Sequence, residues 1–171
     1  MWIILALIIL TIVLTVSITW PQLRGAPWLP SSMKMVHSML TLADVGPDDT
    51  VYDLGCGDGR LIIAAARKYG ANAVGIEIDP LRYIWCQIVI TFLGLRNQVK
   101  IIFGDLFSKD LSPATVITCY LLQDTNDRLE GKLKQELNPG TRVVSNAFVF
   151  QKLMKVRQDG DAKLYLCNWG N

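Results

Sequence analysis

One stretch of the chain, residues 51–60 with the sequence VYDLGCGDGR, combines side chains whose types and spacing suit ligand binding. Gly55, Gly57 and Gly59 recur at every second position after a predicted β-strand, and Asp53 lies where that strand ends. Because glycine has no Cβ, such a loop can turn tightly and its backbone can approach a ligand closely. A helix predicted over residues 61–69 follows at once, and the free N–H groups of its first turn face the same place. The stretch therefore predicts a site for a nucleotide-like ligand.

The spacing of the glycines and the charge of Asp53 narrow the choice of ligand. The pattern is Gly-x-Gly-x-Gly, whereas the dinucleotide fingerprint is Gly-x-Gly-x-x-Gly. The carboxylate of Asp53 would repel a diphosphate and attract a ligand with an ammonium or sulfonium group. The loop therefore favours S-adenosylmethionine over NAD, and an NAD-linked oxidoreductase is the disfavoured alternative.

Polar side chains also follow the later strands. Glu77 ends the strand predicted over residues 73–78, and Asp105 follows the one over residues 99–103. Ligands of open parallel sheets bind beyond the carboxyl ends of the strands, so these acids should lie near the glycine loop. Glu77 could accept hydrogen bonds from two ribose hydroxyls, and Asp105 could accept one from an adenine amino group. Tyr120 at the end of the fourth strand and Asp124 just after it are further polar candidates for the site.

Strands and helices alternate along residues 31–171, which predicts an α/β fold with a mostly parallel sheet and right-handed crossovers. A C-terminal hairpin should add one antiparallel strand. The strands are predicted over residues 50–54, 73–78, 99–103, 114–121, 141–145, 152–157 and 162–168, and the helices over residues 32–43, 61–69, 81–93 and 126–137.

Residues 1–20 contain no charged side chain. Twenty helical residues rise about 30 Å, which is the thickness of the hydrocarbon core of a bilayer. We therefore predict a transmembrane anchor over residues 1–20, with the lipid bilayer as its partner, and a linker over residues 21–30. Arg24 and Lys34 follow the apolar run, which predicts a single-pass protein whose folded domain faces the cytoplasm or an equivalent interior compartment. A cleaved signal peptide would have a basic start, and a buried core helix would be amphipathic, so both alternatives are less favoured.

Composition excludes several classes of function. The chain has 171 residues and a net charge of +2 without a basic block, so we predict no nucleic-acid partner. Its four cysteines lie far apart and form no Cys-x-x-Cys, which predicts reduced thiols rather than a metal site. His37 is the single histidine, so a mechanism that needs two histidines is excluded.

The apolar segment over residues 83–95 has two interpretations. It is too short to span a bilayer, and as a crossover helix it would bury a broad face on the sheet. Alternatively, its outer face contacts lipid or a membrane-protein substrate.

The sequence DLGCGDG over residues 53–59, followed by Glu77 and Gly104–Asp105, resembles the motifs of class I, seven-strand S-adenosylmethionine-dependent methyltransferases. Three further stretches resemble the small membrane-anchored protein-lysine methyltransferases, a family that includes the enzymes acting on adenine nucleotide translocase and the ATP synthase c-subunit. These stretches are PWLPSS over residues 27–32, YLLQ over residues 120–123 and RVVSNAF over residues 142–148. The chain departs from that family at Gln123, where its members usually have proline.

The resemblance implies a Rossmann-like seven-strand sheet, S-adenosylmethionine as cofactor, and a lysine of a membrane or membrane-adjacent protein as acceptor. It implies that Tyr120 lines the methyl-transfer site. The cofactor contacts that it implies are Asp53, Gly55, Cys56, Gly57, Gly59, Glu77, Ile78, Asp105, Leu106, Pro30 and Ser31.

Several alternatives remain open at this point. Tyr120, Asp124 or water could take the proton that a lysine acceptor must lose. Tyr120 could instead be a packing residue at the end of the sheet, and Asp124 a helix cap. The acceptor could also be a small molecule or lipid, or the domain could be a non-catalytic module that only binds the cofactor.

Overall fold

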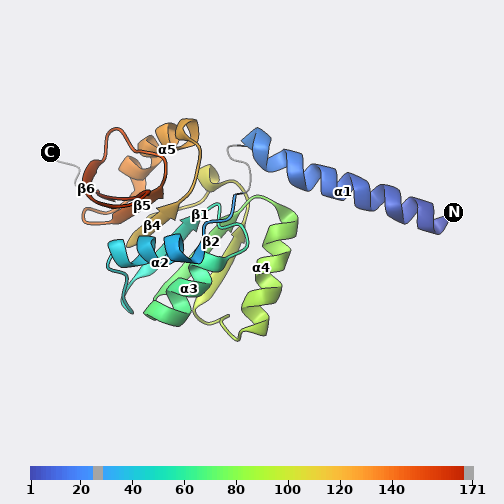
Figure 1. The fold of residues 1–171 in the computed structure, drawn as a ribbon, viewed down its shortest axis with the longest axis horizontal. Coiled ribbons are helices and arrows are strands. Elements are labelled where there is room, and N and C mark those ends of the chain that lie inside the picture. The colour runs from blue at the N-terminus through green and yellow to red at the C-terminus, as the bar shows by residue number, and fades with distance from the viewer. Residues whose placement is uncertain (25–28, 168–171) are drawn as a thin grey trace.

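The computed structural model describes residues 1–24 and 29–167, and in the N-terminal helix the side chains of residues 1–12 and 15. A seven-stranded sheet with the order β3-β2-β1-β4-β5-β7-β6 forms its centre (Figure 1). The strands are β1 (Thr50–Leu54), β2 (Asn72–Glu77), β3 (Val99–Phe103), β4 (Val116–Cys119), β5 (Arg142–Asn146), β6 (Met154–Asp159) and β7 (Ala162–Leu166). The first five strands pair in parallel, and β7 is antiparallel to both β5 and β6. The predicted α/β sheet with its antiparallel C-terminal strand is confirmed.

Local signals at the helix ends explain where the helices begin and end. Ser32 caps α2 by accepting a hydrogen bond from Met35 N at 3.2 Å, and Asp79 caps α4 by accepting one from Leu81 N at 2.7 Å. Gly70 ends α3 with a φ of +74°, a conformation that glycine adopts without strain. The helices are α1 (Trp2–Arg24), α2 (Met33–Leu42), α3 (Arg60–Tyr69), α4 (Pro80–Phe92) and α5 (Gln123–Glu136), together with the 3₁₀ turn η1 (Leu106–Ser108).

The two faces of the sheet are covered unequally. Helices α2, α3 and α4 share one core with the sheet residues Val51, Ala73 and Val116. On the other face, α5 packs through Leu129 and Leu133 in a second core, and only η1 connects β3 to β4. The carboxyl ends of the parallel strands lie between these two layers, and loops rather than helices surround them.

Several boundaries differ from the prediction, and two of them enclose residues 120–122. Strand β4 stops at Cys119 rather than at residue 121, and α5 begins at Gln123 rather than at residue 126. The extended backbone of Leu122, with φ −64° and ψ 157°, forms the N-cap without a side-chain hydrogen bond, so the sequence carries no cap signal there. Asp124 consequently lies in the first turn of α5, where its charge interacts favourably with the helix dipole.

The predicted single-pass membrane localisation and its transmembrane helix are contradicted. Across the described parts of the chain, no helix has the length and apolar character needed to cross a bilayer. Helix α1 also continues to Arg24, into the predicted linker, of which residues 25–28 lie outside the described residues. The domain boundaries at residues 20 and 30 stay predictions.

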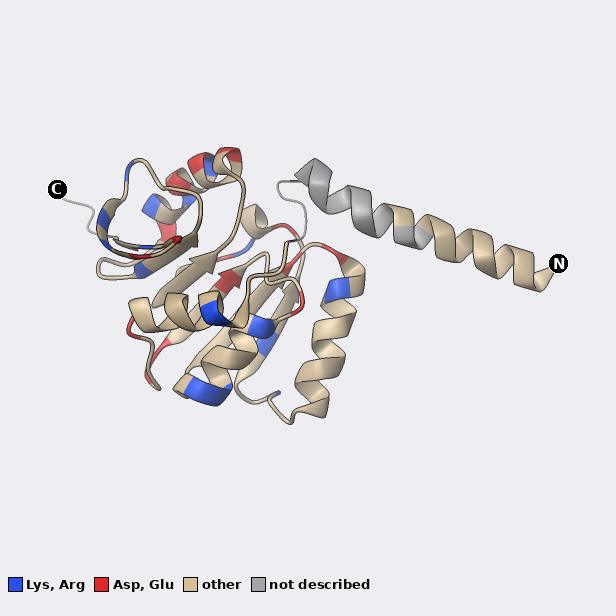
Figure 2. Cartoon of the chain, in the orientation of Figure 1, with Lys and Arg blue, Asp and Glu red and all other residues tan. Residues whose placement is uncertain are grey.

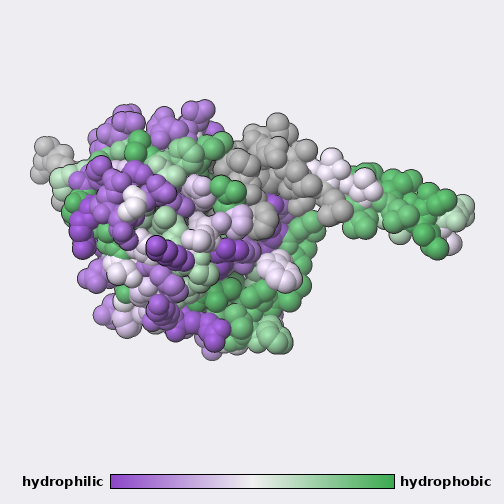
Figure 3. Space-filling model, in the orientation of Figure 1, coloured by the Kyte–Doolittle hydropathy of each residue, from purple (hydrophilic) through white to green (hydrophobic). Residues whose placement is uncertain are grey.

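Helix α4 buries little of its apolar surface. Only Cys86 and Ile90 are buried among its residues, and Phe92 is 88% exposed. The exposed apolar side chains on its outer face are Leu81, Ile84, Trp85, Ile88 and Phe92. Figure 3 shows the resulting hydrophobic surface over α4. The broad burial expected of a crossover helix is therefore not what this helix shows.

Candidate active site

A pocket lies at the carboxyl ends of β1, β2 and β4, where the sheet leaves its strand ends to the loops. Its lining includes Pro30, Ser31, Asp53, Gly55, Cys56, Gly57, Glu77, Ile78, Leu106 and Tyr120, all of them predicted site residues. Three other predicted site residues, Gly59, Asp105 and Asp124, are not part of this lining. The structure thus brings together most of the side chains that the sequence singled out.

The glycine loop has the backbone conformation that its sequence predicts. Gly55, Gly57 and Gly59 have φ angles of +77°, +59° and +80°, which side chains with a Cβ rarely adopt. A Cβ on Gly55 would touch the Leu121 side chain at 3.4 Å. Gly59 is the N-cap of α3 and lies against Cys86 rather than in the lining. Its role is therefore to start the helix, and a cofactor contact stays a prediction.

Glu77 organises the loop as well as the pocket. Its Oε2 accepts a hydrogen bond from Gly57 N at 2.8 Å, and its Oε1 accepts one from Asp79 N at 2.8 Å. Burial raises the pKa of this carboxyl, while the two backbone bonds act in the opposite direction. Each carboxylate oxygen can still accept a second hydrogen bond, so the arrangement is compatible with two ribose hydroxyls.

Asp53 is a buried carboxyl on the same side of the pocket. Its Oδ1 accepts a hydrogen bond from Thr118 Oγ1 at 2.8 Å. Burial raises the pKa of Asp53 to about 7, and the nearby charges of Glu77 and Asp58 contribute in the same direction. Two buried acids close together favour a cationic ligand, which would relieve their mutual repulsion. A molecule with an ammonium and a sulfonium group fits the hydrogen-bond acceptors and the negative charge of these two carboxyls.

Thr118 supports Asp53 from outside the pocket lining, a role that the sequence did not reveal. It lies on β4 directly opposite Asp53 in the register of the two strands. A threonine within a predicted strand carries no signal by itself, because its meaning depends on which residue faces it across the sheet.

The adenine side of the predicted site is less complete. Leu106 lines the pocket, whereas Asp105 Oδ1 accepts a hydrogen bond from Phe107 N at 3.0 Å and caps η1. Asp105 therefore has a structural role at the end of β3, and its contact with adenine stays a prediction.

Tyr120, predicted to line the methyl-transfer site, lies next to the loop after β5. Tyr120 lines the pocket, and its ring lies 6.3 Å from that of Phe148 at an interplanar angle of 30°. Gln123 holds this loop by donating to Val149 O at 2.8 Å and accepting from Val149 N at 3.1 Å. Asp124 is exposed. The residue that departs from the family pattern thus shapes the loop that faces Tyr120.

Comparison with known proteins identifies the family to which the chain belongs. The family model of the ANTKMT methyltransferase domain matches residues 53–157, which run from Asp53 at the end of β1 into β6. The chain belongs to this methyltransferase family. The predicted class of enzyme and its cofactor, S-adenosylmethionine, are confirmed with it.

Individual relatives agree with this assignment. The chain is 46% identical over 123 residues to a protein-lysine N-methyltransferase of Saccharolobus islandicus, covering 71% of this chain and 76% of the relative. It is 30% identical over 132 residues to the human lysine N-methyltransferase of the ATP synthase c-subunit, covering 76% of this chain and 56% of the relative. The chain therefore spans little more than half the length of the human protein.

A solved structure shares the fold at substantial identity. It is described as an RNA methyltransferase from Salinibacter ruber in complex with S-adenosyl-L-homocysteine. The two chains are 41% identical with a TM-score of 0.76, and the match covers 81% of this chain and 92% of that one.

Proposed function

We propose that this methyltransferase transfers the methyl group of S-adenosylmethionine to the side-chain nitrogen of a lysine in a protein. The observation that carries the choice of acceptor is the 46% identity to an archaeal protein-lysine N-methyltransferase over most of both chains. The relatives that act on named proteins, the ATP synthase c-subunit and adenine nucleotide translocase, support the same class of acceptor.

The residues of the pocket suggest how the donor is held. S-adenosylmethionine supplies a methyl group that is already activated on a sulfonium, so the protein mainly aligns and desolvates the reacting groups. Asp53 supplies negative charge to the cationic part of the donor, and Glu77 accepts from the ribose. Leu106 packs against the adenine, and Pro30 and Ser31 cover the bound molecule.

The acceptor enters on the side of Tyr120. A lysine ammonium has no lone pair, so it must lose a proton before it attacks the methyl group. The phenol of Tyr120 lines the pocket, and the carboxylate of Asp124 is exposed outside it. Tyr120 therefore contacts the acceptor amine in this proposal, and solvent takes the proton.

We further propose that the acceptor lysine belongs to a membrane or membrane-adjacent protein. The support for this is the exposed apolar face of α4, with Trp85 57% and Phe92 88% exposed. An apolar face of this kind suits a partner with an apolar surface. A small-molecule or lipid acceptor is the alternative within the same class of enzyme.

RNA is a second candidate acceptor because a structure with 41% identity is described as an RNA methyltransferase. Charge argues against it, since phosphate binding requires clustered basic side chains. Lys and Arg are spread over α2, α3, α4, α5 and the hairpin in Figure 2. The net charge of the chain is only +2.

Transfer of a radiolabelled methyl group to cell extract separates these acceptors. The extract is treated beforehand with protease, ribonuclease or organic solvent, and label is counted after incubation with the enzyme. We expect protease alone to remove the acceptor. Loss of label after ribonuclease treatment would show that the acceptor is RNA rather than lysine. Loss of label after solvent extraction would show that it is a lipid or small molecule.

Binding measurements test the cofactor residues separately from the acceptor. Calorimetry should detect S-adenosylmethionine but not NAD, and Asp53→Ala and Glu77→Ala should each abolish binding. Retained affinity in both variants would overturn the assignment of the cofactor site while leaving the family unchanged.

A further inference from the structure

Ser31, in the segment that covers the pocket, is held by hydrogen bonds from two sides. Arg60 Nη1 donates to Ser31 O at 2.6 Å, and Asn146 Nδ2 donates to Ser31 Oγ at 3.4 Å. Arg60 begins α3 directly after the glycine loop, and Asn146 ends β5. The two bonds therefore join the N-terminal segment to the start of α3 and to the end of β5.

The orientation of Arg60 is set by Asp58. The Nε of Arg60 donates to Asp58 Oδ1 and Oδ2 at 2.9 and 3.0 Å, and its Nη2 donates to Oδ2 at 2.5 Å. Although burial raises the pKa of Asp58, its hydrogen bonds from Arg60 hold that pKa below the ordinary value. The planar guanidinium is thus fixed along one edge, and Nη1 is left pointing to the carbonyl of Ser31.

This arrangement differs from an ordinary surface ion pair. The side chains of Arg60 and Asp58 are 31% and 27% exposed, and both residues line the pocket together with Leu29, Pro30 and Ser31. Because the pair is still partly exposed, it should contribute little to folding stability, about 0–1 kcal/mol. We expect its effect at the rim of the pocket, where the hydrogen bond from the charged guanidinium to the neutral carbonyl of Ser31 restrains the covering segment.

The covering segment depends on Ser31 for this restraint. Residues 29–32 have no regular secondary structure before α2 begins at Met33. Pro30 has no backbone N–H to donate. Leu29 is 63% exposed although it lines the pocket, so it is not held by burial in the core.

We propose that Asp58 and Arg60 form a latch that holds Ser31 over the bound cofactor and slows the release of S-adenosylmethionine and its product. Arg60 is a positioning residue in this account, because it acts through the backbone of Ser31. Asn146 is the second tether. The proposal rests on the cofactor site of this methyltransferase family and is independent of the acceptor.

The dissociation rate of S-adenosylhomocysteine tests the latch. Radiolabelled S-adenosylhomocysteine is bound to the full chain and chased with excess unlabelled ligand. Loss of one charge-assisted hydrogen bond should speed release by about tenfold or more in Arg60→Met. Arg60→Lys keeps the positive charge but loses the planar guanidinium, so its release rate should lie between those of the wild type and Arg60→Met. The release rate of Asp58→Asn should be similar to that of Arg60→Lys.

The matched control is Arg67→Met, an exposed arginine in the last turn of the same helix, which should release the ligand at the wild-type rate. Melting temperatures of the unliganded variants report any effect on folding, and they should stay close to that of the wild type. An unchanged release rate in folded Arg60→Met would overturn the latch. If Arg60→Met fails to fold, a wild-type release rate in Arg60→Lys and Asp58→Asn would overturn it equally. Because no acceptor is present, failure here would not touch the proposed lysine methylation.

Discussion

At the scale of the residue, the site depends on two buried carboxyls that serve different purposes. Glu77 is bonded to backbone N–H groups of the glycine loop and of residue 79, whereas Asp53 is bonded to the hydroxyl of Thr118. A hydroxyl stabilises a carboxylate less than two backbone amides do, and burial raises the pKa of Asp53 to about 7. Asp53 is therefore the group whose charge a cationic cofactor changes most.

Binding of S-adenosylmethionine should strengthen as the pH rises to about 7. The pKa of Asp53 is raised, so the unliganded protein holds a proton there at lower pH, and a cationic ligand must displace it. Affinity should fall about tenfold for each pH unit well below 7 and level off above it. Calorimetry between pH 5.5 and 8.5 measures this change.

Asp53→Asn provides the control for that experiment. It should bind more weakly and lose the part of the pH dependence that belongs to Asp53, so that only the titration of the ligand itself remains. If the affinity of the wild type and that of Asp53→Asn changed with pH in the same way, the role given to this carboxyl would be contradicted.

At the scale of the element, the glycine loop is supported from beneath by β2. A Cβ on Gly75 would lie 2.7 Å from Cys56 Sγ and 2.8 Å from the Cδ1 atoms of Ile101 and Ile62. This glycine allows α3 and the loop to approach the sheet closely. Strands over residues 50–54 and 99–103 were predicted to the residue, because turn residues bound their apolar runs. The packing at Gly75 was not predictable, since it depends on three segments meeting.

Gly75→Ala should destabilise the fold by about 1–3 kcal/mol, the usual cost of overpacking a core. Gly131→Ala is the matched control, because Gly131 lies within α5 and nothing is within 4 Å of an added Cβ. That change should stabilise the protein by about 0.5–1 kcal/mol. Urea unfolding of both variants measures the difference, and a Gly75→Ala protein as stable as the wild type would show that the packing relaxes freely.

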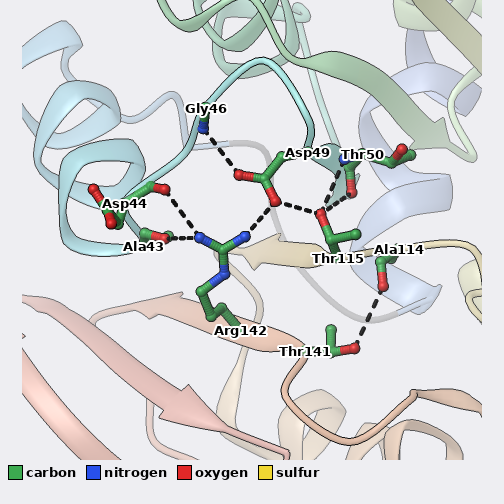
Figure 4. Close-up of polar contacts among 9 residues, drawn as sticks. All are labelled: Ala43, Asp44, Gly46, Asp49, Thr50, Ala114, Thr115, Thr141 and Arg142. Atoms are coloured by element: carbon green, nitrogen blue, oxygen red, sulfur yellow. Dashed lines mark hydrogen bonds and ion pairs between the residues drawn. The ribbon is translucent and has the colours of Figure 1, made fainter.

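At the scale of the whole molecule, one end of the sheet carries the pocket and the other carries polar contacts that hold the strands together. The pocket lies at the carboxyl ends of the strands, and an ion pair between Arg142 and Asp49 lies at the other end (Figure 4). Arg142 Nη1 also donates to Ala43 O at 2.6 Å and Asp44 O at 2.9 Å, while Asp49 accepts from Thr115 Oγ1 at 2.6 Å. These bonds join β5 to the starts of β1 and β4 and to the end of α2.

Removing one partner of this pair should lower stability without changing the site. Arg142→Met leaves Asp49 partly buried without its guanidinium, and we expect a loss of about 2–3 kcal/mol in the free energy of unfolding. The double variant with Asp49→Asn should recover part of the loss. S-adenosylmethionine affinity in the folded variant should match the wild type, and a large drop would show that the two ends are coupled.

The sequence predicted the site better where its residues are close along the chain. Asp53 and the loop glycines belong to one stretch, and the alternation of strands and helices placed Glu77 beside them. Thr118 and the Ser31 contacts of Arg60 and Asn146 depend on strand register and on a long-range approach, which residue types alone do not encode. The prediction of a single-pass membrane protein was wrong, although the uncharged run of residues 1–20, its length and the basic residues after it had all favoured a membrane span.

The chemical identity of the methylated group tests the central claim most directly. Protein labelled by the enzyme with radioactive S-adenosylmethionine is hydrolysed to amino acids, and the label is assigned by chromatography against methylated standards. We predict label in N-ε-methylated lysine and none with the Asp53→Ala enzyme, which should not bind the cofactor. Label in another amino acid, or none in protein while RNA or lipid is labelled, would contradict lysine methylation.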